Sequence, residues 1–138
     1  MALLYYHAAI NNFLVLGTAD KSELMLGYFT KFGDAGADIL PIGELYKSHV
    51  KLLAEELQLP EQIVQKPSSP RFWKGQLAEK EIRLQYHEID RILESYQKND
   101  LKKCKLDKRK IKLVIDMVRK SQHKKREIPI CTLRKSRR

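Results

Sequence analysis

The sequence predicts an α/β fold that is mostly helical, with one or two strands. Residues 13–16 form an uninterrupted apolar run, which is typical of a buried parallel strand. Most other apolar residues recur at helical spacing instead. Because one strand cannot form a sheet with two covered faces, the chain has the pattern of the back half of an α/β domain.

The elements can be predicted one by one from spacing and capping residues. Apolar residues such as Ile89, Ile92 and Leu93 share one helix face. Asp20 and Glu23 have the spacing of a capping box, which marks a helix start. In chain order we expect a helix over 2–11, a strand over 13–16, helices over 20–30, 44–59 and 86–98, and a last helix capped by Asp107.

Residues 60–79 contain Pro60, Pro67, Pro70 and Gly75 and show little periodicity. Loops of this length in a compact domain are usually functional or disordered, so we interpret this segment as a lid. We expect one domain over 1–124 that includes the lid, followed by a basic tail over 125–138.

The formal net charge of +10 is unevenly distributed. Residues 1–97 hold 10 Lys and Arg against 13 Asp and Glu, whereas residues 98–138 hold 17 against 4. This asymmetry indicates an anionic partner, or simply a solvated basic helix face. The two cysteines, Cys104 and Cys131, indicate neither a disulfide framework nor a zinc site. With no apolar run near the ~20 residues of a membrane span, we expect a soluble, cytoplasmic protein.

Polar groups gather between Gly17 and Asp38, directly after the predicted strand. Ligands of open α/β sheets bind at the carboxyl ends of strands, where Thr18 lies. Glu23 could be a Mg²⁺ ligand, or only the second half of the capping box. Lys47 is expected on the first turn of a helix, which is unfavourable for a cation and indicates a nearby anion.

A wider resemblance covers most of the chain. Residues 17–47 read GTADKSELMLGYFTKFGDAGADILPIGELYK, and the likeness continues through the segments 65–69, 72–76, 86–90 and 121–124. In these segments the chain resembles the second half of the ammonia-dependent NAD synthetases of the short, single-domain type. The resemblance implies the C-terminal half of a Rossmann-like domain of the adenine-nucleotide alpha-hydrolase type.

The resemblance also implies a reaction in NAD biosynthesis. Enzymes of this family use ATP and Mg²⁺ to adenylate deamido-NAD, and ammonia then displaces AMP to give the amide. The positions that match the family's binding residues are Thr18, Lys47 and Ser69 for ATP, Glu23 for the metal, and Lys31, Asp38, His123 and Lys124 for deamido-NAD.

The chain departs from the family pattern at several places, which include a slightly different spacing after Lys124, before Pro129. The family's first half carries a Ser-Gly-Gly-x-Asp-Ser loop that cradles pyrophosphate, and no two glycines are adjacent in these 138 residues. Ala78 stands where Asp is common, and Arg83 stands where Gly is usual. We therefore expect a C-terminal half that forms a homodimer or complements an N-terminal half, and that does not turn over alone.

The alternative is a non-enzymatic basic protein that binds nucleic acid through residues 98–138. No Phe, Tyr or Trp follows Tyr96, so this segment has no platform on which bases could stack. We therefore do not expect nucleic acid as a partner.

Overall fold

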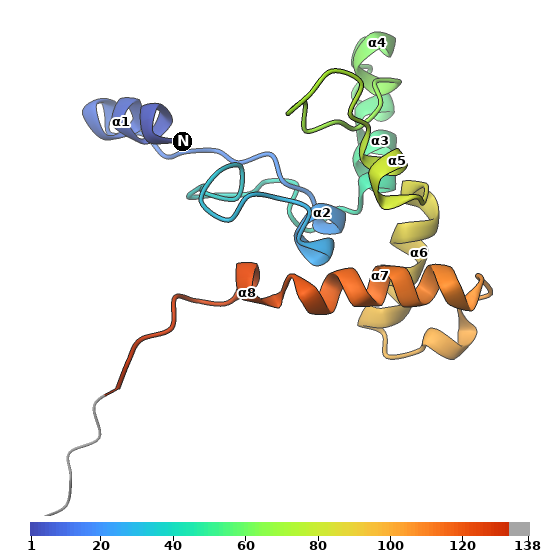
Figure 1. Ribbon diagram of the computed structural model, residues 1–138. Coiled ribbons are helices and arrows are strands. Elements are labelled where there is room, and N and C mark those ends of the chain that lie inside the picture. Colours follow the sequence, from blue (N-terminus) through green and yellow to red (C-terminus); the bar gives the residue numbers. More distant parts are fainter. Residues whose placement is uncertain (133–138) are drawn as a thin grey trace, which may run out of the picture.

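The computed structural model describes residues 1–132, which form short and medium helices joined by loops (Figure 1). The helices are α1 (Ala2–Asn11), α2 (Lys21–Leu26), α3 (Lys47–Glu56), α4 (Glu61–Val64), α5 (Ala78–Ile82), α6 (Tyr86–Gln97), the 3₁₀ helix η1 (Leu101–Lys103), α7 (Lys108–Lys120) and α8 (Gln122–Lys125). The predicted mostly helical character is confirmed in this part of the chain.

Helix α6 is the centre of the hydrophobic core. Its residues Ile89, Ile92 and Leu93 are 0% exposed, and the helix packs against α2, α3 and α7. Helix α7 crosses α6 in Figure 1 and contributes the buried Val114 and Val118. The apolar spacing that predicts these two helices therefore marks the faces that they bury against each other.

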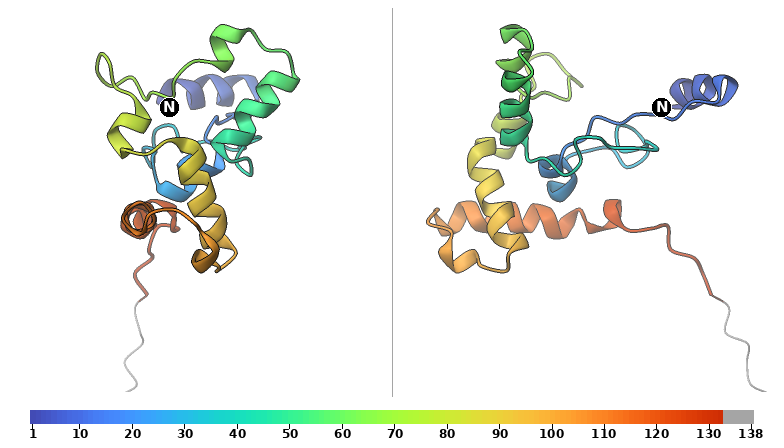
Figure 2. Two further views of the ribbon diagram at one scale, coloured as in Figure 1. Left: turned by 90° about the vertical axis from the view of Figure 1, so that its right-hand side faces the viewer. Right: turned by 180° about the vertical axis from the view of Figure 1, so that it is seen from behind.

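Helix α1 lies apart from this core (Figures 1 and 2). Ala8 is its one buried residue. The apolar face predicted for this helix is exposed, with Leu3, Tyr6 and Ile10 between 61% and 76% accessible. The helix is linked to the rest of the chain by a hydrogen bond from the Tyr5 hydroxyl to an Asp38 carboxylate oxygen at 3.3 Å.

Residues 13–16 do not form the predicted strand. Leu16 makes an isolated parallel bridge to Ile39, and within the described residues no longer ladder forms. Val15 is buried, but Leu14 is 72% exposed. A regular strand needs neighbouring strands to pair its backbone groups, and this part of the chain supplies a single bridge. The prediction of one or two strands is therefore wrong for residues 1–132.

Helix α2 begins and ends at two local signals. The capping box is confirmed, because Asp20 Oδ1 accepts the Glu23 N–H at 2.9 Å and Glu23 Oε2 accepts the Asp20 N–H at 3.2 Å. At the other end Gly27 has a φ of 72°, a left-handed conformation that favours glycine. A Cβ there would lie 2.0 Å from the Cβ of Ser121. Helix α2 therefore ends well before residue 30, the end predicted from the sequence.

The predicted lid over 60–79 is not entirely irregular. Helix α4 lies inside it and α5 begins at its end, at Ala78. Neither was predicted, and nor was α8, because helices of four or five residues are too short to show a periodic pattern. The domain boundary that we expected at residue 124 falls inside α8, and residues 133–138 of the expected tail lie outside the described part.

The third predicted helix begins later than expected, at Lys47 instead of residue 44, and ends at Glu56. Helix α7 begins as predicted, because the Asp107 side chain accepts the Arg109 N–H at 2.7 Å. At 13 residues α7 is the longest helix within residues 1–132, and neither it nor any other helix there is long and apolar enough to cross a membrane.

Candidate functional site

Three charged side chains meet where α2 and α3 begin. The ammonium of Lys47 lies 2.5 Å from Asp20 Oδ2 and 2.6 Å from Glu23 Oε1. Each carboxylate uses its other oxygen in the capping box of α2. The Asp20 side chain is 1% exposed and that of Lys47 is 25% exposed, so the ion pair is largely shielded from water. The fold thus brings together Glu23 and Lys47, which the resemblance assigns to metal and ATP.

The proton affinities in this cluster follow from burial and charge. Burial lowers the pKa of Lys47, but the carboxylates of Glu23 and Asp20 outweigh it, and the pKa is raised overall. Burial raises the pKa of Glu23, and the charge of Asp20 adds to this effect, whereas Lys47 opposes it. The Lys47 ammonium also lies 5.3 Å from the centre of the Tyr86 ring. The site therefore favours a cation beside its two carboxylates.

A second set of polar groups is joined to this cluster through the backbone of Lys47. The Ser22 hydroxyl donates to Asp90 Oδ1 at 2.5 Å, and the Ser48 N–H donates to Asp90 Oδ2 at 2.9 Å. Ser22 Oγ also accepts the backbone N–H of Lys47 at 2.9 Å. Sequence reasoning missed Ser22 and Asp90, which are both buried. An aspartate among the apolar residues of α6 was the signal that could have found the second of them.

A cavity of about 840 Å³ opens beside Lys47. Basic, apolar and hydroxyl side chains line it, including Lys47, Lys51, Lys66, Arg71, Leu59, Ile63 and Ser69. Ser69 Oγ donates to the Gln76 carbonyl at 2.6 Å and accepts the Arg71 N–H at 3.2 Å, so it fixes the loop that forms one wall. Two of the three residues predicted for ATP, Lys47 and Ser69, therefore face the same cavity.

The third residue of that set, Thr18, is exposed and does not line this cavity. Asp38 also lies in a different setting from the one predicted. Its carboxylate accepts the Val15 N–H at 2.7 Å and the Tyr5 hydroxyl at 3.3 Å. Within the described residues, Asp38 thus joins the loop after α2 to the N-terminal segment, and its role toward a ligand stays a prediction.

A second cavity, of about 650 Å³, lies where Lys124 of α8 meets the turn after α2. Aromatic side chains line much of it, including Phe29, Phe72 and Trp73, together with Lys124. The Lys124 ammonium donates to the carbonyls of Gly27 at 2.8 Å and Phe29 at 2.7 Å.

Lys31 lies near α8 as well, because its ammonium donates to the His123 carbonyl at 3.2 Å. The fold thus brings together three of the four residues predicted for deamido-NAD, namely Lys31, His123 and Lys124.

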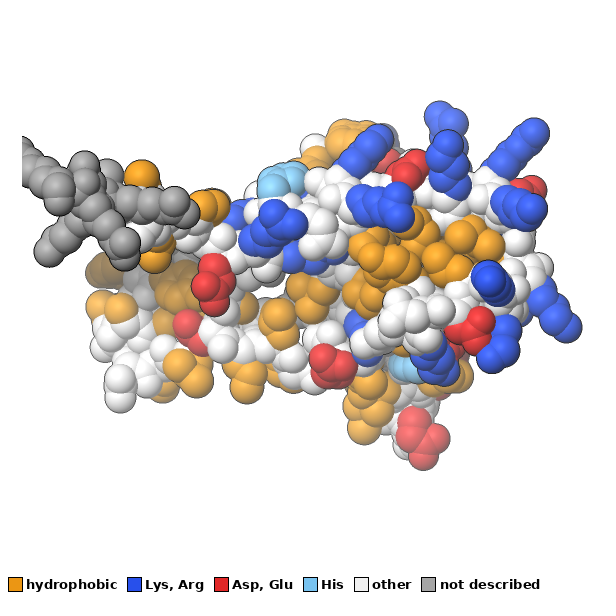
Figure 3. Space-filling view, turned by 90° about the horizontal axis from the view of Figure 1, so that it is seen from below, with side chains coloured by type: hydrophobic (Ala, Val, Ile, Leu, Met, Phe, Trp, Pro, Cys, Tyr) orange, Lys and Arg blue, Asp and Glu red, His pale blue; other side chains and the backbone are white. Residues whose placement is uncertain are grey.

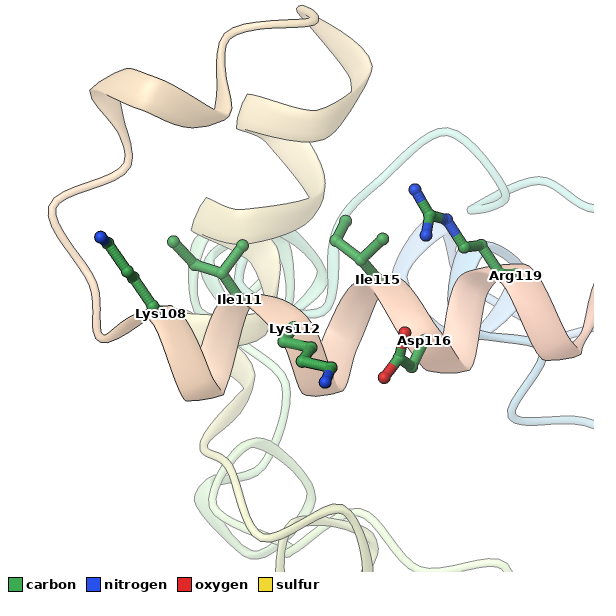
Figure 4. A pocket seen from close by; sticks show the side chains of 6 residues that line it. All are labelled: Lys108, Ile111, Lys112, Ile115, Asp116 and Arg119. Atoms are coloured by element: carbon green, nitrogen blue, oxygen red, sulfur yellow. The ribbon is translucent and has the colours of Figure 1, made fainter.

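Basic side chains gather on another face, over η1 and α7 (Figure 3). Lys108, Ile111, Ile115 and Arg119 follow one another along α7 beside a shallow groove of about 270 Å³ (Figure 4). None of the residues predicted for ATP, deamido-NAD or metal lines this groove. The basic face is therefore separate from the two cavities.

Comparison with known proteins bears on the whole chain. A sequence model of the family described as NAD synthase matches residues 1–129. The chain belongs to the NAD synthase family. The "NH(3)-dependent NAD(+) synthetase" of Sulfurisphaera tokodaii is 50% identical over 133 residues, which are 91% of this chain and 47% of that protein. The protein of the same name from Archaeoglobus fulgidus is 46% identical, over 97% of this chain and 53% of its own length.

Solved structures of the family are similar as well. An "NMN synthetase" from Francisella tularensis matches 96% of this chain and 52% of its own, with a TM-score of 0.82 and 32% identity. An "NH3-dependent NAD synthetase" from Campylobacter jejuni matches 96% and 51%, with a TM-score of 0.76 and 34% identity. The chain spans about half the length of the NAD synthase relatives that it matches.

Mg²⁺, which the NAD synthase family implies, can be tested against the groups around Glu23. Asp20 Oδ2 and Glu23 Oε1 already converge on one cation, the Lys47 ammonium. Within residues 1–132 no group of three or more Asp, Glu, His or Cys could hold a metal ion alone. Mg²⁺ usually takes one or two carboxylates and completes its shell with water and phosphates. The residues present therefore fit a Mg²⁺ that arrives with a nucleotide.

Proposed function

We propose that this chain supplies ATP- and deamido-NAD-binding residues of an ammonia-dependent NAD synthetase. Membership of the NAD synthase family supports the activity class. The observation that carries the proposal is the shared cavity of Lys47 and Ser69, which lies beside the Glu23 carboxylate. A cavity with several Lys and Arg side chains suits a triphosphate, because these charges neutralise the phosphate oxygens.

In this proposal Lys47 has two alternative anionic partners. Without nucleotide its ammonium is held by Asp20 and Glu23. When ATP enters with Mg²⁺, the metal would be held by Glu23 and Asp20, and Lys47 would turn to the phosphates. Bound there, Mg²⁺ would withdraw charge from the phosphate oxygens as a Lewis acid.

Deamido-NAD would bind at the second cavity. Lys124 and the neighbouring Lys31 supply positive charge for its pyrophosphate, and Phe29, Phe72 and Trp73 offer apolar surface for its rings. Asp38 and His123 complete the proposed deamido-NAD set from the resemblance, and Thr18 completes the ATP set.

The proposed chemistry is the reaction of the family that the chain resembles. A nicotinate carboxylate oxygen attacks the α-phosphorus of ATP, a P–O bond forms, and pyrophosphate leaves with its electron pair. Ammonia then attacks the acyl carbon, AMP leaves, and one proton passes to solvent. The role of Lys47 is to hold charge on the departing pyrophosphate, which is the electrostatic stabilisation that such transfers need.

The binding half of this proposal can be tested on the chain alone. Trp73 is the single tryptophan and lies in the loop between the two cavities, so its fluorescence can follow a titration with Mg·ATP. Lys47→Met and Ser69→Ala should each weaken binding by about tenfold. Lys98→Met, which removes an exposed surface pair with Glu94, is the matched control. Equal affinities for all four proteins would contradict the assignment of the cavity.

The catalytic half of the proposal can be tested with the N-terminal half of a relative added to the chain. The chain lacks adjacent glycines for a pyrophosphate loop, so we expect no NAD from deamido-NAD, Mg·ATP and ammonium when it is assayed alone. The N-terminal half of a relative should restore turnover. Because one solved relative is named an NMN synthetase, nicotinate mononucleotide belongs in the assay as a competing substrate. Full activity of the lone chain would show that the missing loop is dispensable.

A further inference from the structure

Asp90 is a buried carboxylate that the proposed chemistry does not use. It lies on α6, is 5% exposed, and no Lys or Arg in the described part of the chain forms an ion pair with it. Its two oxygens instead accept the Ser22 hydroxyl and the Ser48 N–H. A buried carboxylate without a cation is unfavourable unless hydrogen bonds to its oxygens offset the loss of hydration.

The hydrogen bonds show what Asp90 holds. The first amides of a helix have no partner within the helix, and the Tyr46 side chain, at the N-cap position of α3, makes no capping bond. Two of these amides are satisfied from other helices: Ser48 by Asp90 on α6, and Lys47 by Ser22 on α2. The start of α3 is thus capped by side chains from elsewhere in the fold.

This cap determines where Lys47 can reach. Ser22 lies on α2 between Asp20 and Glu23, the two residues whose carboxylates bind the Lys47 ammonium. Because the Ser22 hydroxyl also holds the Lys47 backbone, the start of α3 is fixed against the start of α2. The negative charge of Asp90 further offsets the unfavourable position of a lysine on the first turn of a helix.

We propose that Asp90 is a positioning residue which, through Ser22 and Ser48, holds Lys47 in register with Asp20, Glu23 and the adjacent cavity. The proposal rests on the proposed function only in taking Lys47 as the nucleotide-binding lysine. Asp90 itself touches neither the cavity nor a ligand position, since it is absent from the residues that line the 840 Å³ cavity.

The test measures the acetylation rate of each lysine separately and does not require the chain to turn over substrate. Trace acetylation under native conditions, read by mass spectrometry, gives a relative rate for each lysine. Lys51, one turn further along α3, is the internal reference, because its ammonium has a surface contact with Gln65. The variants are Asp90→Asn, Asp90→Ala and Ser22→Ala. Glu94→Gln, one turn along α6 with an exposed partner, is the control.

In Ser22→Ala and Asp90→Ala we expect the acetylation rate of Lys47 to rise about tenfold relative to that of Lys51. Each substitution removes a hydrogen bond, and losing one changes an equilibrium constant by roughly that factor. Asp90→Asn should give a smaller rise, because its amide oxygen can still accept from Ser48 while Ser22 accepts from its NH₂. Glu94→Gln should leave the ratio unchanged. If Asp90→Ala does not fold, the two milder variants decide. The proposal would be overturned if the ratio of the Lys47 rate to the Lys51 rate does not change, whether both rates stay constant or both rise equally.

A second arm separates this idea from the proposed function. Mg·ATP, added with the N-terminal half of a relative, should slow acetylation of Lys47 in the wild-type chain. If it does not, the nucleotide assignment fails, whereas the rate ratios without nucleotide still decide the role of Asp90.

Discussion

The Lys47 ammonium lies 2.5 Å from Oδ2 of Asp20, a carboxylate that is almost completely buried. From spacing alone, Lys47 indicated an anion near the first turn of its helix. The first such anions are this chain's own Asp20 and Glu23. A ligand phosphate would therefore have to compete with two carboxylates for this ammonium, unless a metal ion replaces it there.

Replacing Lys47 should expose how much the fold depends on this pair. Lys47→Met leaves the buried Asp20 carboxylate without its cation, so we expect the free energy of unfolding to fall by about 2 kcal/mol. Lys51→Met, on the same helix with an exposed hydrogen bond to Gln65, should change it by less than ~0.5 kcal/mol. Urea unfolding followed by circular dichroism measures both. Equal losses in the two variants would mean that the pair contributes nothing specific.

Alkaline pH should weaken the fold through Tyr86. Burial raises the pKa of its hydroxyl to about 12, from 10.0. A pKa that is higher in the folded state gives a contribution that is complete below the unfolded value and is lost as pH rises from 10 to about 12. The raised pKa values of Lys47 and Tyr28 act in the same direction.

The measurement is urea unfolding at about pH 9 and about pH 11, where Tyr86→Phe should lose roughly 1 kcal/mol less stability than the wild type between the two conditions. Tyr6→Phe, on the exposed face of α1, is the matched control and should behave as the wild type. If the free energy of unfolding of the wild type does not fall between these two pH values, the raised pKa of Tyr86 is contradicted.

The parts that the sequence predicted well are those set by local rules. The capping box of α2, the Asp107 cap and the buried faces of α6 and α7 each depend on residues within one or two turns. The predicted strand failed because its stability depends on partners that residues 1–132 do not supply. Asp90 was missed because its role appears only when α2, α3 and α6 meet. Its partner Ser22 lies 68 residues away in the sequence.

The resemblance adds a prediction about backbone strain. Arg83 stands where the family usually has Gly, and it ends α5 with a φ of 64°, in the left-handed region. A non-glycine residue there is less favourable by roughly 1 kcal/mol, so Arg83→Gly should stabilise the chain by about that amount. Arg91→Gly, in the interior of α6, should instead destabilise it by about 1 kcal/mol. Thermal and urea unfolding distinguish the two. A loss of stability in Arg83→Gly would show that the arginine side chain matters more than the strain.

The exposed apolar surface around α1 predicts self-association. Leu14 and Leu16 are 72% and 64% exposed, next to the open face of α1 and beside the single bridge to Ile39. Apolar area of this kind on one side of a chain is typical of an interface. We therefore expect the wild-type chain to sediment as more than a monomer.

Salt and a paired variant identify the cause. Association driven by charge weakens as salt rises, whereas association driven by apolar contact does not, so the predicted assembly should persist at high salt. Leu14→Gln with Leu16→Gln should shift the chain toward the monomer. Leu52→Gln with Leu57→Gln replaces two leucines of similar exposure, 62% each, one on α3 and one at its C-cap, and should leave the sedimentation unchanged. A wild-type chain that is monodisperse and monomeric at both low and high salt would contradict the predicted self-association through this surface.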